Sequence, residues 1–350
     1  MPQRKAPPPR RPYVRHDAAW RRKRRRQQNA VTLAILALIL LVLGFLIFLI
    51  TRLFSKPKEP SSGNTSSSGA VSASAGPSSA GASGDEEPSS ALADMGRVAR
   101  TRSDLSSGDL ILVNFDNSYE VEPPGLVSIA GAKTSDYGVK NSEIQLRDYV
   151  IPYLNEMMAD FRAATGIGNV VILSSYRSVE YQRGLYEKEL ARTGKDYSDE
   201  VTKPGYSEHH TGLTIDLAYI ASDGSWPFYD GQGDYGWINE NSWKYGFIVR
   251  YPENKSDVTK IIHEPWHFRF LGPAHAEMVQ KSGLCYEEYM EMLKKHPVTD
   301  PYTFSGDSGS YTVYYVPLIG DSAEVPVPKD KTYTISGSNE GGFIVTVTEN

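Results

Sequence analysis

The chain has 350 residues, of which 40% are hydrophobic and 23% charged, a composition typical of globular proteins with a sizeable core. Its single cysteine, Cys285, excludes an intramolecular disulfide and a structural zinc ribbon. The first 59 residues carry fourteen Lys and Arg and two acidic residues, whereas the remainder carries 23 basic and 40 acidic residues. Because nucleic acids are bound through Lys and Arg contacts to phosphate, this acidic remainder argues against a nucleic acid partner.

The N-terminal segment has the pattern of a membrane anchor. A basic tail, residues 1–29, contains the run Arg21–Arg26 and precedes an apolar stretch, residues 30–51, that is about long enough to span a bilayer. The positive-inside rule then predicts a single-pass protein of the cell membrane, with a cytoplasmic N-terminus and an extracytoplasmic C-terminal bulk. A cleaved signal peptide is the alternative, although its apolar core would be shorter and a small-residue cleavage site would follow it.

Residues 52–104 are predicted to form a flexible linker. Ser and Gly dominate this stretch, above all in Ser61–Ser90, a composition typical of random-coil tethers. Ordered structure is expected from about Asp109, where "DLILVNF" predicts a strand.

The next segments alternate between helical and strand patterns. Apolar residues recur at helical spacing over residues 142–165, with Pro152 expected to kink this helix and Gly166 to end it. A second helix is expected in "VEYQRGLYEKELARTG", and a last helical region from Pro273 to about His296. Strands are predicted in "NVVILSSYRS", "HTGLTIDLAYI", "YGFIVRY" and "KIIHEPWHFRF". After these, residues 298–350 read as a small all-β appendage of short strands.

The segment "IIHEPWHFRF" contains His263-Glu264-x-x-His267, which matches the zincin signature of two His ligands on one helical turn with a general base between them. Pro265 argues against a helix here, because a proline inside a helix removes a backbone donor and clashes with the preceding turn. On a strand, in contrast, a bend or bulge at Pro265 would bring Glu264 and His267 to one side.

A second motif, "SEHHTGLTIDLA", supplies the remaining groups that a catalytic zinc site needs, namely three N or O ligands and a nearby base. We expect His209, Asp216 and His267 to bind zinc, since Gly212 lets the chain turn so that His209 returns to the same metal as Asp216. Glu264 is then the general base. Arg177, at the polar end of its strand, is a candidate donor to an oxyanion.

The combined motifs resemble those of the VanY-type D-alanyl-D-alanine carboxypeptidases, zinc peptidases of the LAS type. The matching residues are Ser207, His209, Gly212 and Asp216; Glu264, Pro265, Trp266 and His267; and Tyr176, Arg177, Ser178 and Gln182. Thr214 departs from the pattern, because a smaller residue often stands two positions before the Asp. The resemblance spans about residues 109–297.

The resemblance implies an α+β fold, in which a small antiparallel sheet carries the zinc and helices pack on it, in a domain spanning residues 105–297. It also implies hydrolysis of the terminal D-Ala from peptidoglycan stem peptides that end in D-Ala-D-Ala. The zinc ligands carry over to His209, Asp216 and His267, the base to Glu264, and the transition-state stabiliser to Arg177. Gln182 and Ser207 would hold the substrate's C-terminal end, and Tyr176 of the same upstream motif is also expected to bind substrate. Trp266 would either line the substrate cleft or pack in the core.

Several alternatives remain open. His210 is a less favoured zinc ligand, His263 is expected to face away from the metal, and Cys285 is expected to be a buried small hydrophobe. An L,D-carboxypeptidase or a D,D-endopeptidase would use the same scaffold. A non-catalytic wall-binding protein would be expected to lack the base or one of the metal ligands. The base and all three proposed ligands are present here.

Overall fold

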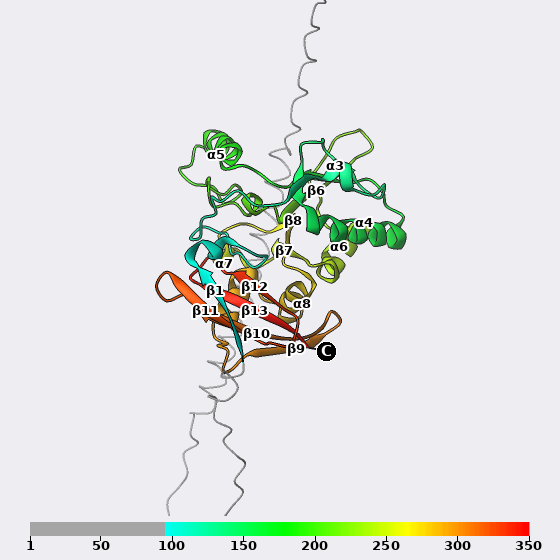
Figure 1. Ribbon diagram of the computed structural model, residues 1–350. Helices are drawn as coiled ribbons and strands as arrows, with labels where there is room; N and C mark the ends of the chain where they lie inside the picture. Colours follow the sequence, from blue (N-terminus) through cyan, green and yellow to red (C-terminus); the bar gives the residue numbers. More distant parts are fainter. Residues whose placement is uncertain (1–94, 350) are drawn as a thin grey trace, which may run out of the picture. The chain divides into compact units, whose positions relative to one another are not determined.

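The central sheet of the structure has five strands in the order β3-β5-β6-β8-β7. Its strands β6, β8 and β7 are labelled in Figure 1. The computed structural model describes residues 95–349, so the predicted tail, the predicted anchor and most of the predicted linker lie outside the described residues. The strands are β3 (Gly138–Val139), β5 (Val170–Ser174), β6 (Thr214–Tyr219), β8 (Glu264–Phe270) and β7 (Phe247–Tyr251). Neighbouring strands pair antiparallel, except that β3 and β5 are parallel. The predicted α+β class is confirmed, and the sheet is mixed rather than purely antiparallel.

Helix α4 (Ile151–Thr165) covers one face of this sheet together with α6 (Gly236–Asn241) and the 3-10 helix η5 (Ser242–Tyr245). The buried side chains of α4 recur every three or four residues and pack in one core with Ile215 and Leu217 of β6. This spacing places them on one side of the helix. The buried residues of α4 are Ile151, Leu154, Met157, Met158 and Phe161.

The predicted start of this helix is wrong. Residues Gln145–Arg147 form strand β4, the 3-10 helix η2 (Asp148–Val150) follows, and α4 begins at Ile151. Pro152 therefore lies in the first turn of α4. Backbone N–H groups in the first turn have no acceptor within the helix, so a proline there breaks no helical hydrogen bond and causes no kink. The predicted end is confirmed, because Gly166 has a φ of 74° and its N–H bonds to Arg162.

The remaining elements of this part of the chain lie outside the five-stranded sheet. Strand β4 pairs with β2 (Leu126–Ser128). The helices are α3 (Ile129–Ala132), α5 (Val179–Thr193), α7 (Ser256–Thr259), and the 3-10 helices η3 (Glu208–Thr211) and η4 (Gly233–Tyr235). Within residues 95–349, no helix has both the length and the apolar character that crossing a bilayer requires.

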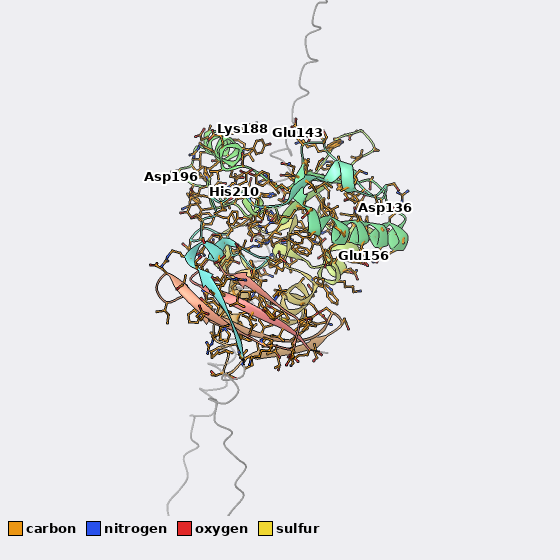
Figure 2. All side chains as sticks on the ribbon, viewed as in Figure 1. Asp136, Glu143, Glu156, Lys188, Asp196 and His210 are labelled. Carbon is orange, nitrogen blue, oxygen red and sulfur yellow. The ribbon has the colours of Figure 1, made fainter. Side chains whose placement is uncertain are left out.

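Two helices separate the central sheet from a second sheet. The predicted helical region from Pro273 divides at Gly283 into α8 (Pro273–Ser282) and α9 (Tyr286–Leu293). The second sheet has the order β12 (Tyr333–Gly337), β13 (Gly342–Glu349), β10 (Gly309–Pro317) and β9 (Tyr302–Gly306). Apolar residues of α8 and α9 share a core with Val313 and Ile344 of this sheet. Side chains fill the space between the layers (Figure 2).

The predicted C-terminal strands are present, but they do not stand alone. Strand β11 (Ser322–Val327) pairs antiparallel with β1 (Gly96–Thr101), and the 3-10 helix η1 (Arg102–Ser106) follows β1. The predicted linker boundary at residue 104 is therefore wrong, because Gly96–Thr101 is a strand. A partner more than 200 residues away decides this structure, and local composition does not reveal it.

The predicted strand in "DLILVNF" is also wrong, although Leu110–Val113 is buried. The backbone N–H of Leu112 bonds to Ser338, whereas the carbonyls of Asp109 and Ile111 accept hydrogen bonds from the guanidinium of Arg269. The side chain of Arg269 thus binds the backbone carbonyls that would otherwise pair with a neighbouring strand.

Candidate active site

Two adjacent strands place an aspartate and a histidine directly opposite each other. In the β6–β8 ladder Asp216 is the register partner of His267, and directly opposite residues in an antiparallel pair have Cβ atoms about 5 Å apart. Asp216 Oδ1 lies 3.2 Å from His267 Nδ1. Both residues are buried.

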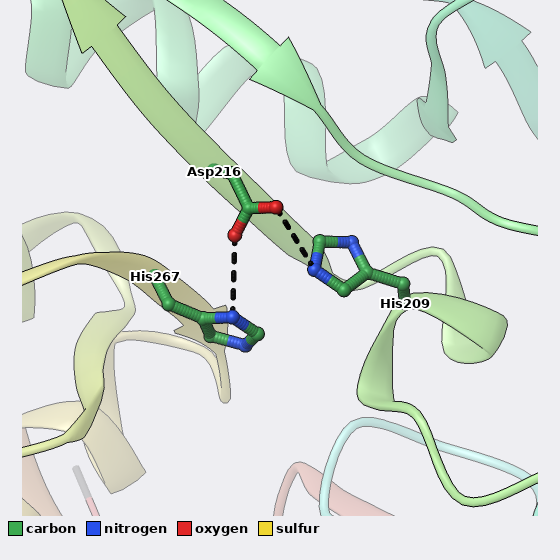
Figure 3. Close-up of side chains that lie close together, drawn as sticks. All are labelled: His209, Asp216 and His267. Carbon is green, nitrogen blue, oxygen red and sulfur yellow. Dashed lines mark ion pairs between the residues drawn. The ribbon is translucent and has the colours of Figure 1, made fainter. Parts of the chain in front are cut away.

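His209 reaches the same point from the 3-10 helix η3. Its Nε2 lies 3.2 Å from Asp216 Oδ2 (Figure 3), and its Nδ1 donates to the carbonyl of Ser175 at 2.6 Å. The helix ends at Gly212, whose φ is 64°. A Cβ at this position would come within 2.7 Å of Leu126, so both the conformation and the space call for glycine.

His209, Asp216 and His267 form a group that could hold a metal ion. Each offers one ligand atom, and these three atoms lie within 4.8 Å of one another; no second such group occurs within residues 95–349. His209 Nε2 and Asp216 Oδ1 are buried and have no hydrogen-bond partner among the described residues. Buried polar atoms are normally paired, so these atoms fit a bound cation.

The charges around His267 also favour a cation. Burial alone would lower its pKa, but the nearby carboxylates of Asp216, Glu208 and Glu264 outweigh burial and raise the pKa to about 10. Burial lowers the pKa of His209 to about 4, assisted by the positive charge of Arg177. The carboxylates around His267 and the neutral imidazole of His209 together suit a divalent metal ion.

Glu264 lies on β8 beside this group. Its Oε2 is 3.4 Å from His267 Nδ1, although the two residues are an odd number of positions apart. The β7–β8 register explains this, because the pairing moves from Val249↔Phe268 to Tyr251↔Glu264, leaving extra residues in β8 at Pro265. The predicted bulge is therefore confirmed. Burial raises the pKa of Glu264, which suits a general base.

Arg177 lies at the edge of the group, with 17% of its side chain exposed. Its Nη2 pairs with Asp216 Oδ2, and its Nε donates to Ser174 Oγ at 2.8 Å. The guanidinium therefore points into the site.

The other predicted substrate residues have different surroundings. Gln182 is buried on α5, where Nε2 donates to the carbonyl of Thr202 at 2.8 Å, and Oε1 has no partner among residues 95–349. Ser207 is buried at the start of η3. Tyr176 is half-buried. Half-buried Trp266 stacks on Phe228 with ring centroids 4.9 Å apart and packs against the core.

The remaining histidines near the site have backbone partners. His210 bonds through Nδ1 to the carbonyl of Arg177 at 2.7 Å and through Nε2 to the N–H of Gly205 at 3.1 Å. His263 bonds through Nδ1 to the carbonyl of Tyr251 at 2.8 Å.

Sequence reasoning missed a buried charge cluster next to the site. Glu208 pairs with Arg250 and Arg269, and Arg250 also pairs with Glu287. Burial would raise the pKa of Glu208, but the two guanidinium groups hold it well below its usual range. The available signal was an arginine inside each of the apolar strands "FIVRY" and "HFRF".

Comparisons with known proteins place this chain in a family. The VanY family model of D-alanyl-D-alanine carboxypeptidases matches residues 143–273. A D-alanyl-D-alanine carboxypeptidase of Enterococcus faecium is 32% identical over 253 residues, which are 71% of this chain and 77% of the relative. The bifunctional D-Ala-D-Ala dipeptidase and carboxypeptidase VanXYC of Enterococcus gallinarum is 32% identical over 54% of this chain and 96% of its own length.

A solved structure extends the similarity to the fold. The vancomycin resistance D,D-dipeptidase VanXYg, in complex with a D-Ala-D-Ala phosphinate analogue, superimposes with a TM-score of 0.65 and 30% identity, covering 73% of this chain and 99% of that protein. The resemblance read from the motifs is therefore confirmed, and the chain belongs to the VanY family of D-alanyl-D-alanine carboxypeptidases.

Proposed function

We propose that this protein is a zinc-dependent D,D-carboxypeptidase that removes the terminal D-Ala from peptidoglycan stem peptides ending in D-Ala-D-Ala. The observation that carries the proposal is the convergence of His209, Asp216 and His267 on one buried point, with Glu264 beside them. The names of the Enterococcus relatives support the choice of substrate.

Zinc fits this set of donors. Two imidazoles and one carboxylate, with a further position open to water, are the ligands of catalytic zinc. When bound, zinc supplies a Lewis acid that polarises a peptide carbonyl and lowers the pKa of water. The Nδ1–H of His209 donates a hydrogen bond to the carbonyl of Ser175, which leaves Nε2 free to bind the metal.

The protein's own groups then carry the protons and the charge. Glu264 accepts a proton from the attacking water and passes it to the leaving amine. Arg177 donates to the oxyanion that develops on the scissile carbonyl. Gln182, Ser207, Tyr176 and Trp266 are the residues that we propose hold and orient the peptide.

A second candidate function is cleavage of the free dipeptide D-Ala-D-Ala. The superposition on the dipeptidase VanXYg covers nearly all of that protein, and the bifunctional VanXYC is matched over 96% of its length. Both activities break the same bond, and they differ in how much peptide the cleft accepts on the N-terminal side of that bond.

One experiment distinguishes these functions. The zinc-loaded full-length protein is incubated separately with four substrates, and the products are identified by mass spectrometry. The substrates are a pentapeptide ending in D-Ala-D-Ala, a tetrapeptide ending in an L,D-bond, a cross-linked peptide dimer, and the dipeptide D-Ala-D-Ala. We expect loss of one alanine from the pentapeptide. Cleavage of only the tetrapeptide or the dimer would replace the proposal with an L,D-carboxypeptidase or a D,D-endopeptidase, and cleavage of none would leave a wall-binding protein.

We also propose that this activity lies outside the cytoplasm, in a catalytic domain tethered to the cell membrane. The support is the apolar stretch of residues 30–51 behind the basic tail. Fractionation of cells that express the full chain, with protease added from outside, tests it. A catalytic domain that remains protected in intact cells whose wall has been removed would contradict the proposal.

A further inference from the structure

The carboxylate of Glu208 lies behind His267, on the opposite side of the imidazole from Asp216 and Glu264. His267 Nδ1 faces Asp216 and Glu264, whereas Nε2 lies 3.7 Å from Glu208 Oε2. Both Nε2 and Oε2 are buried, and neither has a hydrogen-bond partner among residues 95–349. A donor and an acceptor that lack other partners thus face each other.

Glu208 is held firmly in this position. Its Oε1 accepts hydrogen bonds from Arg250 Nε at 2.8 Å and from Arg269 Nη1 at 2.9 Å. Arg269 is fixed in turn, because its Nη2 donates to the carbonyls of Asp109 and Ile111. The side chain of Glu208 is fully buried, so its rotamer is set by these contacts.

The charges of the cluster balance. Glu287 accepts from Arg250 Nη1 at 2.9 Å, so two carboxylates face two guanidinium groups. An unpaired buried charge would destabilise the fold, whereas here Glu208 can stay ionised without a further cation. Its free oxygen Oε2 is available to accept a hydrogen bond from the Nε2–H of His267.

We infer that Glu208 is a positioning residue that fixes His267 as the Nε2–H tautomer and so presents Nδ1 to the metal. The inference rests on the proposed zinc site. A carboxylate partner of this kind orients a metal-binding imidazole and makes its other nitrogen more basic. The two ligand histidines are thus oriented differently, His209 by a backbone carbonyl and His267 by a buried carboxylate.

A purely structural role makes a different prediction. If Glu208 served only to neutralise Arg250 and Arg269, its loss would lower stability and leave the zinc affinity of the folded protein unchanged. Zinc affinity and the tautomer of His267 are therefore the informative measurements, and neither depends on turnover.

The test compares Glu208→Gln with Glu287→Gln in the full-length protein. Both variants remove one carboxylate that pairs with Arg250, but only Glu208 faces His267. When the amide introduced by Glu208→Gln offers its carbonyl to the guanidinium groups, its NH2 group points at the Nε2–H of His267. We expect the zinc dissociation constant, measured against a competing chelator, to rise about 10- to 100-fold for Glu208→Gln and to stay at the wild-type value for Glu287→Gln. Equal affinity of Glu208→Gln and wild type would overturn the inference.

A second measurement needs no variant. In the wild-type protein, nitrogen-15 NMR of the imidazole should find the proton of His267 on Nε2 when zinc is bound. A proton on Nδ1 would overturn the role of Glu208 even if Glu208→Gln failed to fold. A wild-type protein that binds no zinc would overturn the zinc site and this inference together, whereas zinc binding with the wrong tautomer would overturn only the inference.

Discussion

Asp216 and His267 lie opposite each other on neighbouring strands, with Oδ1 and Nδ1 3.2 Å apart. The register of the sheet alone fixes this pair, because a slip of one residue would turn one of the two side chains to the other face. The bulge in β8 brings the side chain of Glu264 to the same side of the sheet as His267. The rigid sheet thus holds two proposed ligands and the proposed base, and a short 3-10 helix adds His209.

Replacing Glu264 with Gln should separate zinc binding from turnover. The amide keeps the size of the side chain but cannot take a proton from water, so kcat should fall by at least about 100-fold. Zinc should remain bound, because Glu264 is not among the three proposed ligands. Metal analysis and steady-state kinetics of the same preparation check both expectations. His267→Ala is the comparison variant and should lose the metal and the activity together, and near-normal turnover of Glu264→Gln would show that another group is the base.

Removing zinc should abolish activity and lower the melting temperature. A ligand that binds only the folded state stabilises it by about 4 kcal/mol when its free concentration is a thousand times its dissociation constant. We expect one zinc per chain, loss of activity on chelation, and recovery of both activity and melting temperature when zinc is returned. Asp216→Asn serves as the control, because its melting temperature should respond far less to zinc. Full activity of the metal-free protein would contradict the proposed mechanism.

The proposed ligands and base could be predicted because their motifs are short. His209 and Asp216 share one segment, and Glu264 and His267 share another, so the sequence needed to reveal only that two segments meet. Pro265 indicated the bulge, because it excludes the helical alternative. Glu208 could not be found in this way, since its partners Arg250 and Arg269 are 42 and 61 residues away and nothing local shows that their charges meet.

The edges of the fold were less predictable for the same reason. The strand Gly96–Thr101 lies within the predicted Ser/Gly-rich linker, and only its pairing with β11 makes it a strand. The segment "DLILVNF" has the composition of a strand, yet Arg269 occupies two of its carbonyls. In both places a distant partner decides the structure, whereas α4 and its end at Gly166 depend on local signals.

His275 should make stability depend on pH. Burial lowers its pKa to about 4 from the ordinary 6.5, and its ring bonds to Tyr289 and Thr346, which joins α8 to β13. Between these two pH values the unfolded chain binds the proton and the folded chain does not, so stability falls as the pH falls. The loss from pH 7 to pH 5 should be about 2 kcal/mol.

Urea unfolding of wild type and His275→Gln at both pH values measures this contribution. The variant keeps polar atoms near Tyr289 and Thr346, but its glutamine does not titrate. Between pH 7 and pH 5 its free energy of unfolding should therefore fall by about 2 kcal/mol less than that of wild type. The other histidines are common to both proteins and cancel in the difference. The same loss in both proteins would mean that His275 is not held neutral.

Arg177→Lys should lower kcat more than it raises KM. Lysine keeps the positive charge but lacks the planar fork that lets Arg177 contact Asp216 and Ser174 together. If Arg177 meets charge that develops only in the transition state, its replacement should reduce kcat by about 100-fold or more, as expected for the loss of one oxyanion donor.

Steady-state kinetics on a D-Ala-D-Ala peptide, with a thermal melt of each variant, distinguishes the possible roles of Arg177. Arg183→Lys is the matched control, since Arg183 lies on α5, is half exposed and pairs only with Glu180 among the described residues; its kinetics should not change. A rise in KM with an unchanged kcat would mean that Arg177 grips the terminal carboxylate of the peptide in ground and transition states alike. A lower melting temperature with both kinetic constants preserved would reduce Arg177 to an ion-pair partner of Asp216, and the oxyanion would then need another donor.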